Sequence, residues 1–168
     1  MTKVVHIQYS IDSAGRAAIR LQHAFNNVDV ESCIVSLQHS MYGNNNIKYL
    51  GPNARLISRV EDKIQAYLTK KCNKQLGTFS YPVLGTNVTK LDEVKNADII
   101  YIHWALKGLL NFKSVKQIAG LNKPVIIFLH DIFLLFYLEC LPKDSLLVFQ
   151  HDLFYLEHYH IGIKNSIF

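Results

Sequence analysis

Residues 97–131 read ADIIYIHWALKGLLNFKSVKQIAGLNKPVIIFLHD and decide the fold class. The stretch contains two continuous apolar runs, IIYIHW and VIIFLH, and such runs are typical of strands buried on both faces of a parallel sheet. Between them, residues 109–119 favour a helix that ends at Gly120, and Pro124 opens the second run. A strand, a helix and a strand in this order predict a right-handed β-α-β crossover.

The amino-terminal part of the chain shows the same alternation. Residues 3–9, KVVHIQY, are rich in β-branched side chains and predict a strand. The following SAGRAAIRLQHAF has apolar residues at helical spacing, with Ser13 or Asp12 as its expected N-cap. Residues 28–37 predict another strand, and residues 42–52, which include consecutive asparagines, predict a loop. We therefore expect an α/β fold with a Rossmann-like open parallel sheet and helices on both faces.

The size and composition of the chain limit its class. Its 168 residues suffice for one ordinary α/β domain, and a hydrophobic content of 49% excludes a disordered chain. The three cysteines, Cys33, Cys72 and Cys140, lie far apart without metal-ligand spacing, which favours reduced thiols in a cytosol. The first residues have the pattern of a strand rather than that of a signal peptide. We therefore expect a cytoplasmic protein.

An integral membrane component is the least favoured class. The longest apolar run, residues 125–138, is shorter than the roughly 18 to 20 residues that span a bilayer. His130 and Asp131 interrupt this run, and charged groups at bilayer depth are costly.

Residues 54–74 predict an amphipathic helix with a strongly basic outer face. The apolar positions of this segment form one stripe: Leu56, Ile57, Val60, Ile64, Tyr67 and Leu68. Its basic residues outnumber Glu61 and Asp62 and carry most of the formal charge of +5: Arg55, Arg59, Lys63, Lys70, Lys71 and Lys74. Two interpretations stay open, a solvated surface face or peripheral contact with anionic lipid at the inner face of the membrane. We expect no nucleic-acid partner, because no aromatic residues interleave with these charges.

Small residues follow the first predicted strand, where ligands of an open parallel sheet bind. They are Ser13, Ala14 and Gly15, and Arg16 comes next. Small side chains let the backbone approach a ligand, and a helix N-terminus favours phosphate or sugar hydroxyls. A tight turn with close helix packing explains these residues equally well.

Polar residues also end the two strands of residues 97–131. His103 and Trp104 end the first strand, and His130 and Asp131 end the second. An imidazole can hydrogen-bond a sugar hydroxyl, an indole can stack on a sugar ring, and a paired imidazole and carboxylate suit proton transfer. A capped core histidine beside an interface tryptophan is the competing interpretation. We expect no metal, since the histidines near the carboxyl terminus fit no established ligand spacing.

Two stretches of the chain resemble bacterial family 4 glycosyltransferases of polysaccharide biosynthesis. The opening KVVHIQYSIDSAGRAAIRLQHAF is similar to the family's strand, glycine-rich loop and A-R-A-A-x-R-L-H-x-A-L helix. Residues 97–131 are similar to the family's A-D-I-V-H-L-H-W and K-P-V-V-W-T-L-H-D segments. The resemblance covers residues 3–131 and implies the N-terminal, acceptor-side domain of a GT-B fold.

The resemblance also implies an activity. It implies a retaining enzyme that moves a sugar from a nucleotide-sugar to a saccharide or lipid-linked acceptor, with no metal or other cofactor. Residues 13–16 would line the cleft near the donor phosphates, and Trp104 would contact substrate. His103, His130 and Asp131 would take the catalytic positions on the acceptor side. The donor would be held mainly by a C-terminal domain that this sequence lacks, so we expect the fragment alone to be inactive.

The sequence departs from the family pattern in two places. The family's paired glycines are replaced by residues 13–15, which leave a single glycine, and residues 132–168 do not align with the family's W-P-F-T-G-G-C continuation. We therefore expect a domain over residues 1–131 and a divergent or out-of-frame, aromatic-rich tail over 132–168 after a truncation. The alternative is a non-catalytic Rossmann-like binding or interaction module whose tail packs as a last helix or strand.

Overall fold

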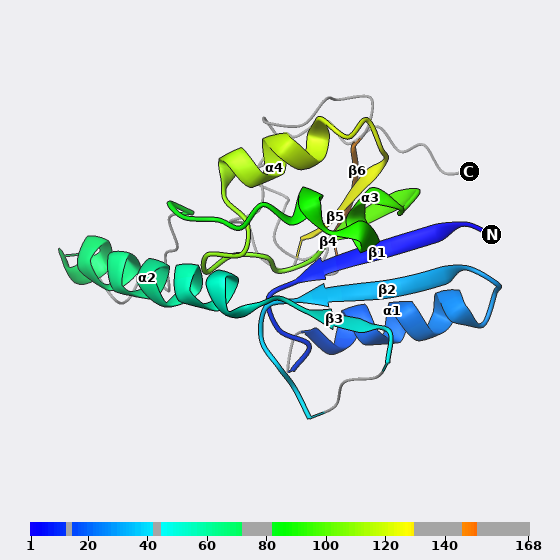
Figure 1. Ribbon diagram of the computed structural model, residues 1–168, viewed down its shortest axis with the longest axis horizontal. Coiled ribbons are helices and arrows are strands. Elements are labelled where there is room, and N and C mark those ends of the chain that lie inside the picture. Colours follow the sequence, from blue (N-terminus) through cyan, green and yellow to red (C-terminus); the bar gives the residue numbers. More distant parts are fainter. Residues whose placement is uncertain (13–14, 42–44, 72–81, 130–145, 151–168) are drawn as a thin grey trace.

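The computed structural model describes residues 1–12, 15–41, 45–71, 82–129 and 146–150. Within them the chain forms a six-stranded sheet with the order β3-β2-β1-β4-β5-β6, and every neighbouring pair is parallel (Figure 1). The strands are β1 (Lys3–Gln8), β2 (Glu31–Ser36), β3 (Ile47–Tyr49), β4 (Ile99–Ile102), β5 (Val125–Leu129) and β6 (Leu146–Gln150). The chain moves outward from β1 to β3, then returns to place β4 beside β1. The topological switch point of the sheet therefore lies between β1 and β4.

Helices pack on both faces of the sheet, as the sequence predicts. Helix α1 (Arg16–Asn26) lies on one face, and Ala18 packs there against Ile34 of β2 and Ile47 of β3. The other face carries η4 (Val88–Lys90), α3 (Asp92–Lys95) and α4 (Phe112–Ala119). The expected α/β class, a Rossmann-like open parallel sheet, is confirmed.

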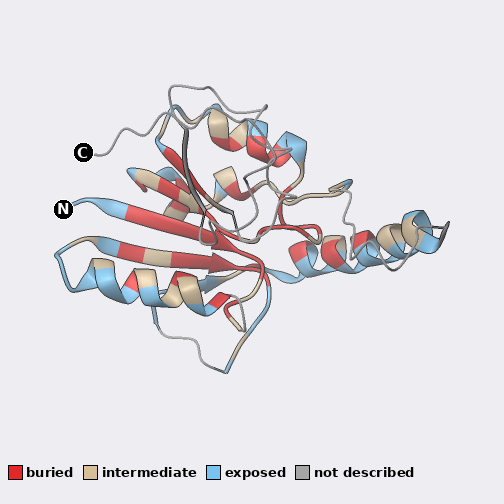
Figure 2. Cartoon of the chain, turned by 180° about the vertical axis from the view of Figure 1, so that it is seen from behind, coloured by how far each residue is buried: buried red, intermediate tan, exposed pale blue. Residues whose placement is uncertain are grey.

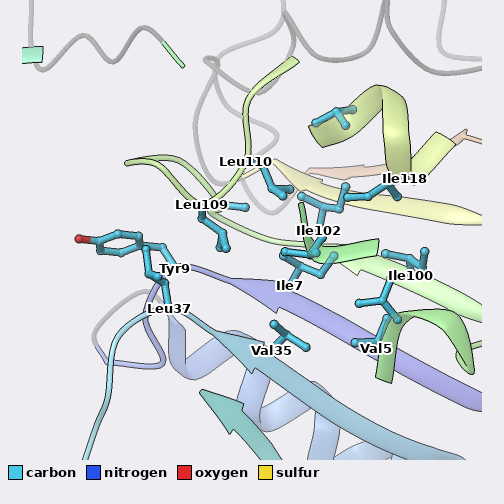
Figure 3. Close-up of a cluster of buried hydrophobic side chains, with 14 of the residues drawn as sticks. Val5, Ile7, Tyr9, Val35, Leu37, Ile100, Ile102, Leu109, Leu110 and Ile118 are labelled. Atoms are coloured by element: carbon cyan, nitrogen blue, oxygen red, sulfur yellow. The ribbon is translucent and has the colours of Figure 1, made fainter. Parts of the chain in front are cut away.

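The larger core lies on the face that α4 covers. Figure 3 shows Ile7 of β1, Ile100 and Ile102 of β4 and Ile118 of α4 meeting in this core, and all are at most 1% exposed. Leu109 and Leu110, with others from the loop between β4 and α4, complete it. Because burying each such side chain contributes about 1.5–3 kcal/mol, this core holds the sheet and α4 together.

Helix α2 (Pro52–Leu68) behaves differently from the other helices. It follows β3 and, with η2 (Thr69–Lys71), extends away from the sheet instead of folding back over it (Figure 1). Figure 2 shows most of its length exposed or half-buried, whereas the central strands are buried. The described residues contain no helix that is both long enough and apolar enough to cross a membrane.

Several element boundaries differ from the sequence expectation. The segment 42–52, expected to be a loop, contains β3, whose run Ile47–Tyr49 is too short to show a strand period. The strand expected over 28–37 starts only at Glu31, because Asp29 adopts a left-handed φ of 57° in a turn. The N-cap of α1 is Gly15, without a side-chain capping bond, so the expected cap at Asp12 or Ser13 is wrong.

The helix expected over residues 109–119 also starts later. Leu109 and Leu110 are buried in the loop, and the side chain of Asn111 caps α4 by accepting from the Ser114 N–H at 2.9 Å. Gly120 is the C-cap, as expected.

Residues 146–150 lie in the segment assigned to a divergent tail, and they form the edge strand β6. They pair in parallel with β5 over the whole strand, from Val125 opposite Leu146 to Leu129 opposite Gln150. Part of this segment therefore extends the sheet.

Candidate functional site

The carboxyl ends of β1 and β4 lie side by side at the switch point. The Tyr9 N–H donates to the Trp104 carbonyl at 2.9 Å, and the His103 N–H donates to the Ile7 carbonyl at 3.0 Å. These bonds continue the ladder beyond the strands, so the loops after β1 and β4 start from neighbouring positions. In an open α/β sheet this is the place where ligands bind.

Gly15 shapes the loop after β1. A Cβ at this position would lie 1.9 Å from the Ser10 carbonyl oxygen and 2.9 Å from the Gln8 side-chain nitrogen, which no larger residue could tolerate. The Gly15 N–H donates to the Asp12 carbonyl at 3.0 Å and closes the turn. The expected close packing at Gly15 is therefore present, and the exposed Arg16 follows at the start of α1. Ser13 and Ala14 lie outside the described residues.

Gln8 lies beneath this loop at the end of β1 and is 2% exposed. Its amide nitrogen donates to the Ser10 carbonyl at 2.9 Å, whereas its oxygen has no hydrogen-bond partner in the described part of the chain. The Gln8 amide thus holds the first residues of the loop after β1 in place.

His103 is fully buried, and its side chain points to the face of the sheet that α1 covers. Its Nε2 lies 3.0 Å from Nδ1 of His6, a residue 97 positions away, and Nε2 of His6 lies 3.0 Å from the Ser32 hydroxyl. Burial lowers the pKa of His6 to about 3, so this ring is neutral at physiological pH. A neutral imidazole has one donor and one acceptor, and these two contacts can use both.

Aromatic rings surround the two histidines and complete an imidazole cluster, defined here as His6, His103, Phe25, Tyr101 and Phe128. Phe25 stacks on His6 with ring centroids 5.8 Å apart, and Phe128 stacks on His103 at 5.1 Å. Tyr101 contacts both imidazoles, and burial raises the pKa of its phenol. The sequence predicts the His103 ring at the rim, but in the structure this ring belongs to the buried imidazole cluster.

Trp104 points away from the imidazole cluster and stays half-buried at the rim. The Trp104 and Tyr9 rings meet in an edge-to-face contact, with ring centroids 5.3 Å apart. The ammonium group of Lys107 lies 5.7 Å from the Tyr9 ring and 5.8 Å from the Trp104 ring, within cation–π range. We call these three residues the rim cluster. They join an aromatic surface to a positive charge at the switch point.

The backbone holds Lys107 in place. Lys107 and Gly108 both have left-handed φ values, 53° and 79°. A Cβ at Gly108 would lie 2.7 Å from the Cα of Ser58, so the turn packs directly against α2. Both the turn and its contact with α2 require glycine at position 108. The packing of this turn on α2 therefore fixes the backbone position of Lys107.

A second polar group lies at the ends of β2 and β3. The Ser40 hydroxyl donates to the Asp12 carboxylate at 2.5 Å, and His39 stacks on Tyr49 with centroids 4.1 Å apart. These contacts tie the loop after β1 to the next loops along the same edge.

The structure brings together only part of the expected site. Gly15, Arg16 and Trp104 lie in the loops that flank the switch point, while His103 lies beside them with a buried ring. His130 and Asp131 lie outside the described residues. His6, Gln8, Tyr9 and Lys107 are not among the predicted site residues. The alternating faces of β1 are the sequence signal that places His6 and Gln8 on the same face.

The chain matches no known protein family model and no curated protein. In the described ranges, no group of three or more His, Cys, Asp or Glu residues could hold a metal ion.

Proposed function

We propose that this chain is the acceptor-side domain of a sugar-transferring enzyme of the type that family 4 glycosyltransferases represent. The observation that carries the proposal is the position of the rim cluster, between the loops after β1 and β4 at the switch point. The proposed enzyme is cytoplasmic and transfers a sugar from a nucleotide-sugar to a saccharide or lipid-linked acceptor, with retention of configuration, in polysaccharide biosynthesis.

The rim cluster has the chemistry of a saccharide site. Aromatic surfaces with a small number of polar groups are typical of ligand sites, and Trp104 and Tyr9 supply such a surface. Lys107 adds an ammonium group that can hydrogen-bond hydroxyls or pair with a carboxylate or phosphate. Gly15 lets the β1 loop pack tightly, so that Arg16 and the start of α1 lie close to the same edge.

The residues assigned to catalysis from the sequence keep their place in the proposal. His130 and Asp131 follow β5, the neighbour of β4. The His103 ring is buried, so its part in the proposal is positioning: through His6 it holds the end of β4, from which Trp104 projects. The resemblance assigns the donor diphosphate to a second domain, and we therefore expect this chain alone to bind acceptor weakly without transferring sugar.

Trp104 is the only tryptophan of the chain, so its fluorescence reports directly on the rim cluster. The test is a titration of the purified chain with neutral and acidic mono- and oligosaccharides. We expect a saturable change in emission that Lys107→Gln weakens, while the control Lys113→Gln on the exposed side of α4 leaves it unchanged. No saturable change across the panel would contradict the proposal, and sugar transfer by this chain alone would contradict the expected inactivity.

One observation favours the alternative, a non-catalytic binding or interaction module. Residues 146–150 extend the sheet as β6. A self-contained domain whose tail packs as a last strand would have this arrangement. The alternative predicts that deletion of residues 132–168 lowers the midpoint of thermal unfolding by about 4 °C or more, because β5 loses its pairing with β6 and keeps only β4 as a neighbour. An unchanged midpoint would argue against this module, and the titration above separates it from the saccharide site.

A further inference from the structure

Helix α2 is attached to the body of the protein through small and polar residues. The buried positions of this 17-residue helix are Ala54, Ser58 and Glu61. The Glu61 carboxylate accepts hydrogen bonds from the backbone N–H groups of Val83 and Leu84 at 3.1 and 2.9 Å, and from the Gln65 amide at 2.7 Å. Hydrogen bonds to Glu61 and the close contact between Ser58 and Gly108 therefore orient α2, and Ala54 is its residue in the hydrophobic core.

This orientation leaves several large apolar residues of α2 exposed to solvent. The exposed fractions are 59% for Leu56, 42% for Val60, 79% for Tyr67 and 44% for Leu68. Spacings of three and four residues place these side chains and the half-buried Ile57 and Ile64 on one side of the helix. We call this set the apolar stripe. The sequence predicts such a stripe, but the helix packs on the body through a different face.

A row of cations runs beside the apolar stripe. Arg59 is three residues from Leu56, and Lys63 is three residues from Val60, so each basic side chain neighbours an exposed apolar one. Arg55, Arg59, Lys63 and Lys70 are all exposed, and within the described ranges none of them forms an ion pair. Asp62 is the exposed acidic residue of the helix.

We propose that α2 lies in the surface of an anionic lipid bilayer, with the apolar stripe inserted and the basic row on the headgroups. Helices that bind this way combine an apolar face with lysine and arginine at its border. Figure 1 shows α2 extending beyond the sheet, so the sheet and its other helices leave most of its length uncovered. The basic residues of α2 form no ion pair with the described part of the chain, and their charges match anionic headgroups better than an uncharged protein surface. This inference does not depend on sugar transfer.

The test is co-sedimentation of the full chain with vesicles of phosphatidylcholine, with or without phosphatidylglycerol. We expect binding that requires phosphatidylglycerol and weakens as salt is raised, because screening reduces the attraction between exposed charges. Equal binding to both kinds of vesicle, or no binding to either, would overturn the proposal.

Two double variants separate the parts of the surface. We expect Arg59→Gln with Lys63→Gln to lower the partition coefficient about 30-fold. Leu56→Gln with Val60→Gln should lower it about tenfold or more. The control for the charge variant is Lys113→Gln with Lys116→Gln on α4. The control for the apolar variant is Val28→Gln, at an apolar residue that is 65% exposed and lies outside α2. Neither control should change binding.

Two other results would place a different partner on the apolar stripe. Full binding by both α2 double variants would mean that another surface meets the lipid. A dimer in sedimentation velocity that Leu56→Gln with Val60→Gln converts to a monomer, without any vesicle binding, would identify the stripe as an interface between two copies. Circular dichroism and the unfolding midpoint show whether each variant is folded.

Discussion

Helices α1 and α2 each follow a strand of the same sheet, and both are amphipathic, but only α1 covers the sheet. Each buries a polar residue that bonds to distant backbone groups: Gln22 to the carbonyls of Ser32 and Asn46, and Glu61 to the N–H groups of Val83 and Leu84. Beneath α1 lies the imidazole cluster, whereas α2 exposes its large apolar residues. An amphipathic pattern thus predicts a helix without saying which face the protein buries.

This difference has a physical consequence. Polar groups buried under α1 must find partners, because an unpaired buried donor or acceptor costs about 1–3 kcal/mol. The stability of the fold alone therefore explains the hydrogen bonds of these buried groups. The exposed apolar residues of α2 belong to neither hydrophobic core of the described structure, and we propose that they meet a surface outside the chain.

The largest expected effect concerns the cluster beneath α1. His6→Ala removes a buried ring together with its contacts to His103, Ser32 and Phe25. We expect a loss of about 3 kcal/mol in the free energy of unfolding, measured by urea denaturation. Ser32→Ala, which removes one hydroxyl, should cost only about 1 kcal/mol. Equal costs for the two variants would mean that the ring itself contributes little.

The second prediction concerns the loss of stability at acidic pH. Because burial lowers the pKa of His6 from 6.5 to about 3, the unfolded chain gains a proton in this pH range that the folded chain does not. The stability contributed by neutral His6 is present above pH 6.5 and falls with pH by up to about 1.4 kcal/mol per unit. Urea denaturation as a function of pH should show this slope, and His6→Leu should lack this part of it. An identical slope in the variant would contradict a neutral, buried His6.

The attachment of α2 should be weaker than the packing of α1. Glu61→Gln turns an acceptor of backbone N–H groups into an amide that can direct its own donors at them. We expect a loss of about 1–2 kcal/mol and faster hydrogen exchange at Val83 and Leu84. Glu61→Asp is the matched control that keeps the charge but shortens the side chain. Unchanged exchange in Glu61→Gln would mean that other contacts hold these residues.

The smallest expected effect is on the exposed side of α2. Leu56→Gln should change the free energy of unfolding by less than about 0.5 kcal/mol, since Leu56 is 59% exposed. Ile19→Gln on α1 should cost about 1–2 kcal/mol, because Ile19 packs against the core beneath that helix. Thermal or urea unfolding of both variants checks the comparison. A larger cost at Leu56 would show that the apolar stripe is packed within the protein.

Much of the fold can be predicted from the sequence because its signals are local. The apolar runs of β4 and β5 and the stop at Gly120 are readable in a few consecutive residues. The contact between His6 and His103 depends on β1 and β4 being neighbours, which no local pattern states. The same holds for α2, whose orientation depends on bonds from Glu61 to residues more than 20 positions away.

The candidate site also combines features that local sequence predicts with features that depend on tertiary contacts. The order of strands and loops predicts that Gly15 and Trp104 reach one edge, and the structure has them there. Lys107 contacts Trp104 from a turn in which its own backbone is left-handed and the following Gly108 packs on α2. These are tertiary features that spacing alone does not reveal.

We propose above that a ligand site lies at the switch point between β1 and β4. Backbone amide NMR of the full chain, recorded while a saccharide identified in the Trp104 titration is added, tests it most directly. We predict that the largest shifts fall on Tyr9, Gly15, Trp104 and Lys107. Shifts confined to α4 or to the amino ends of the strands would contradict it.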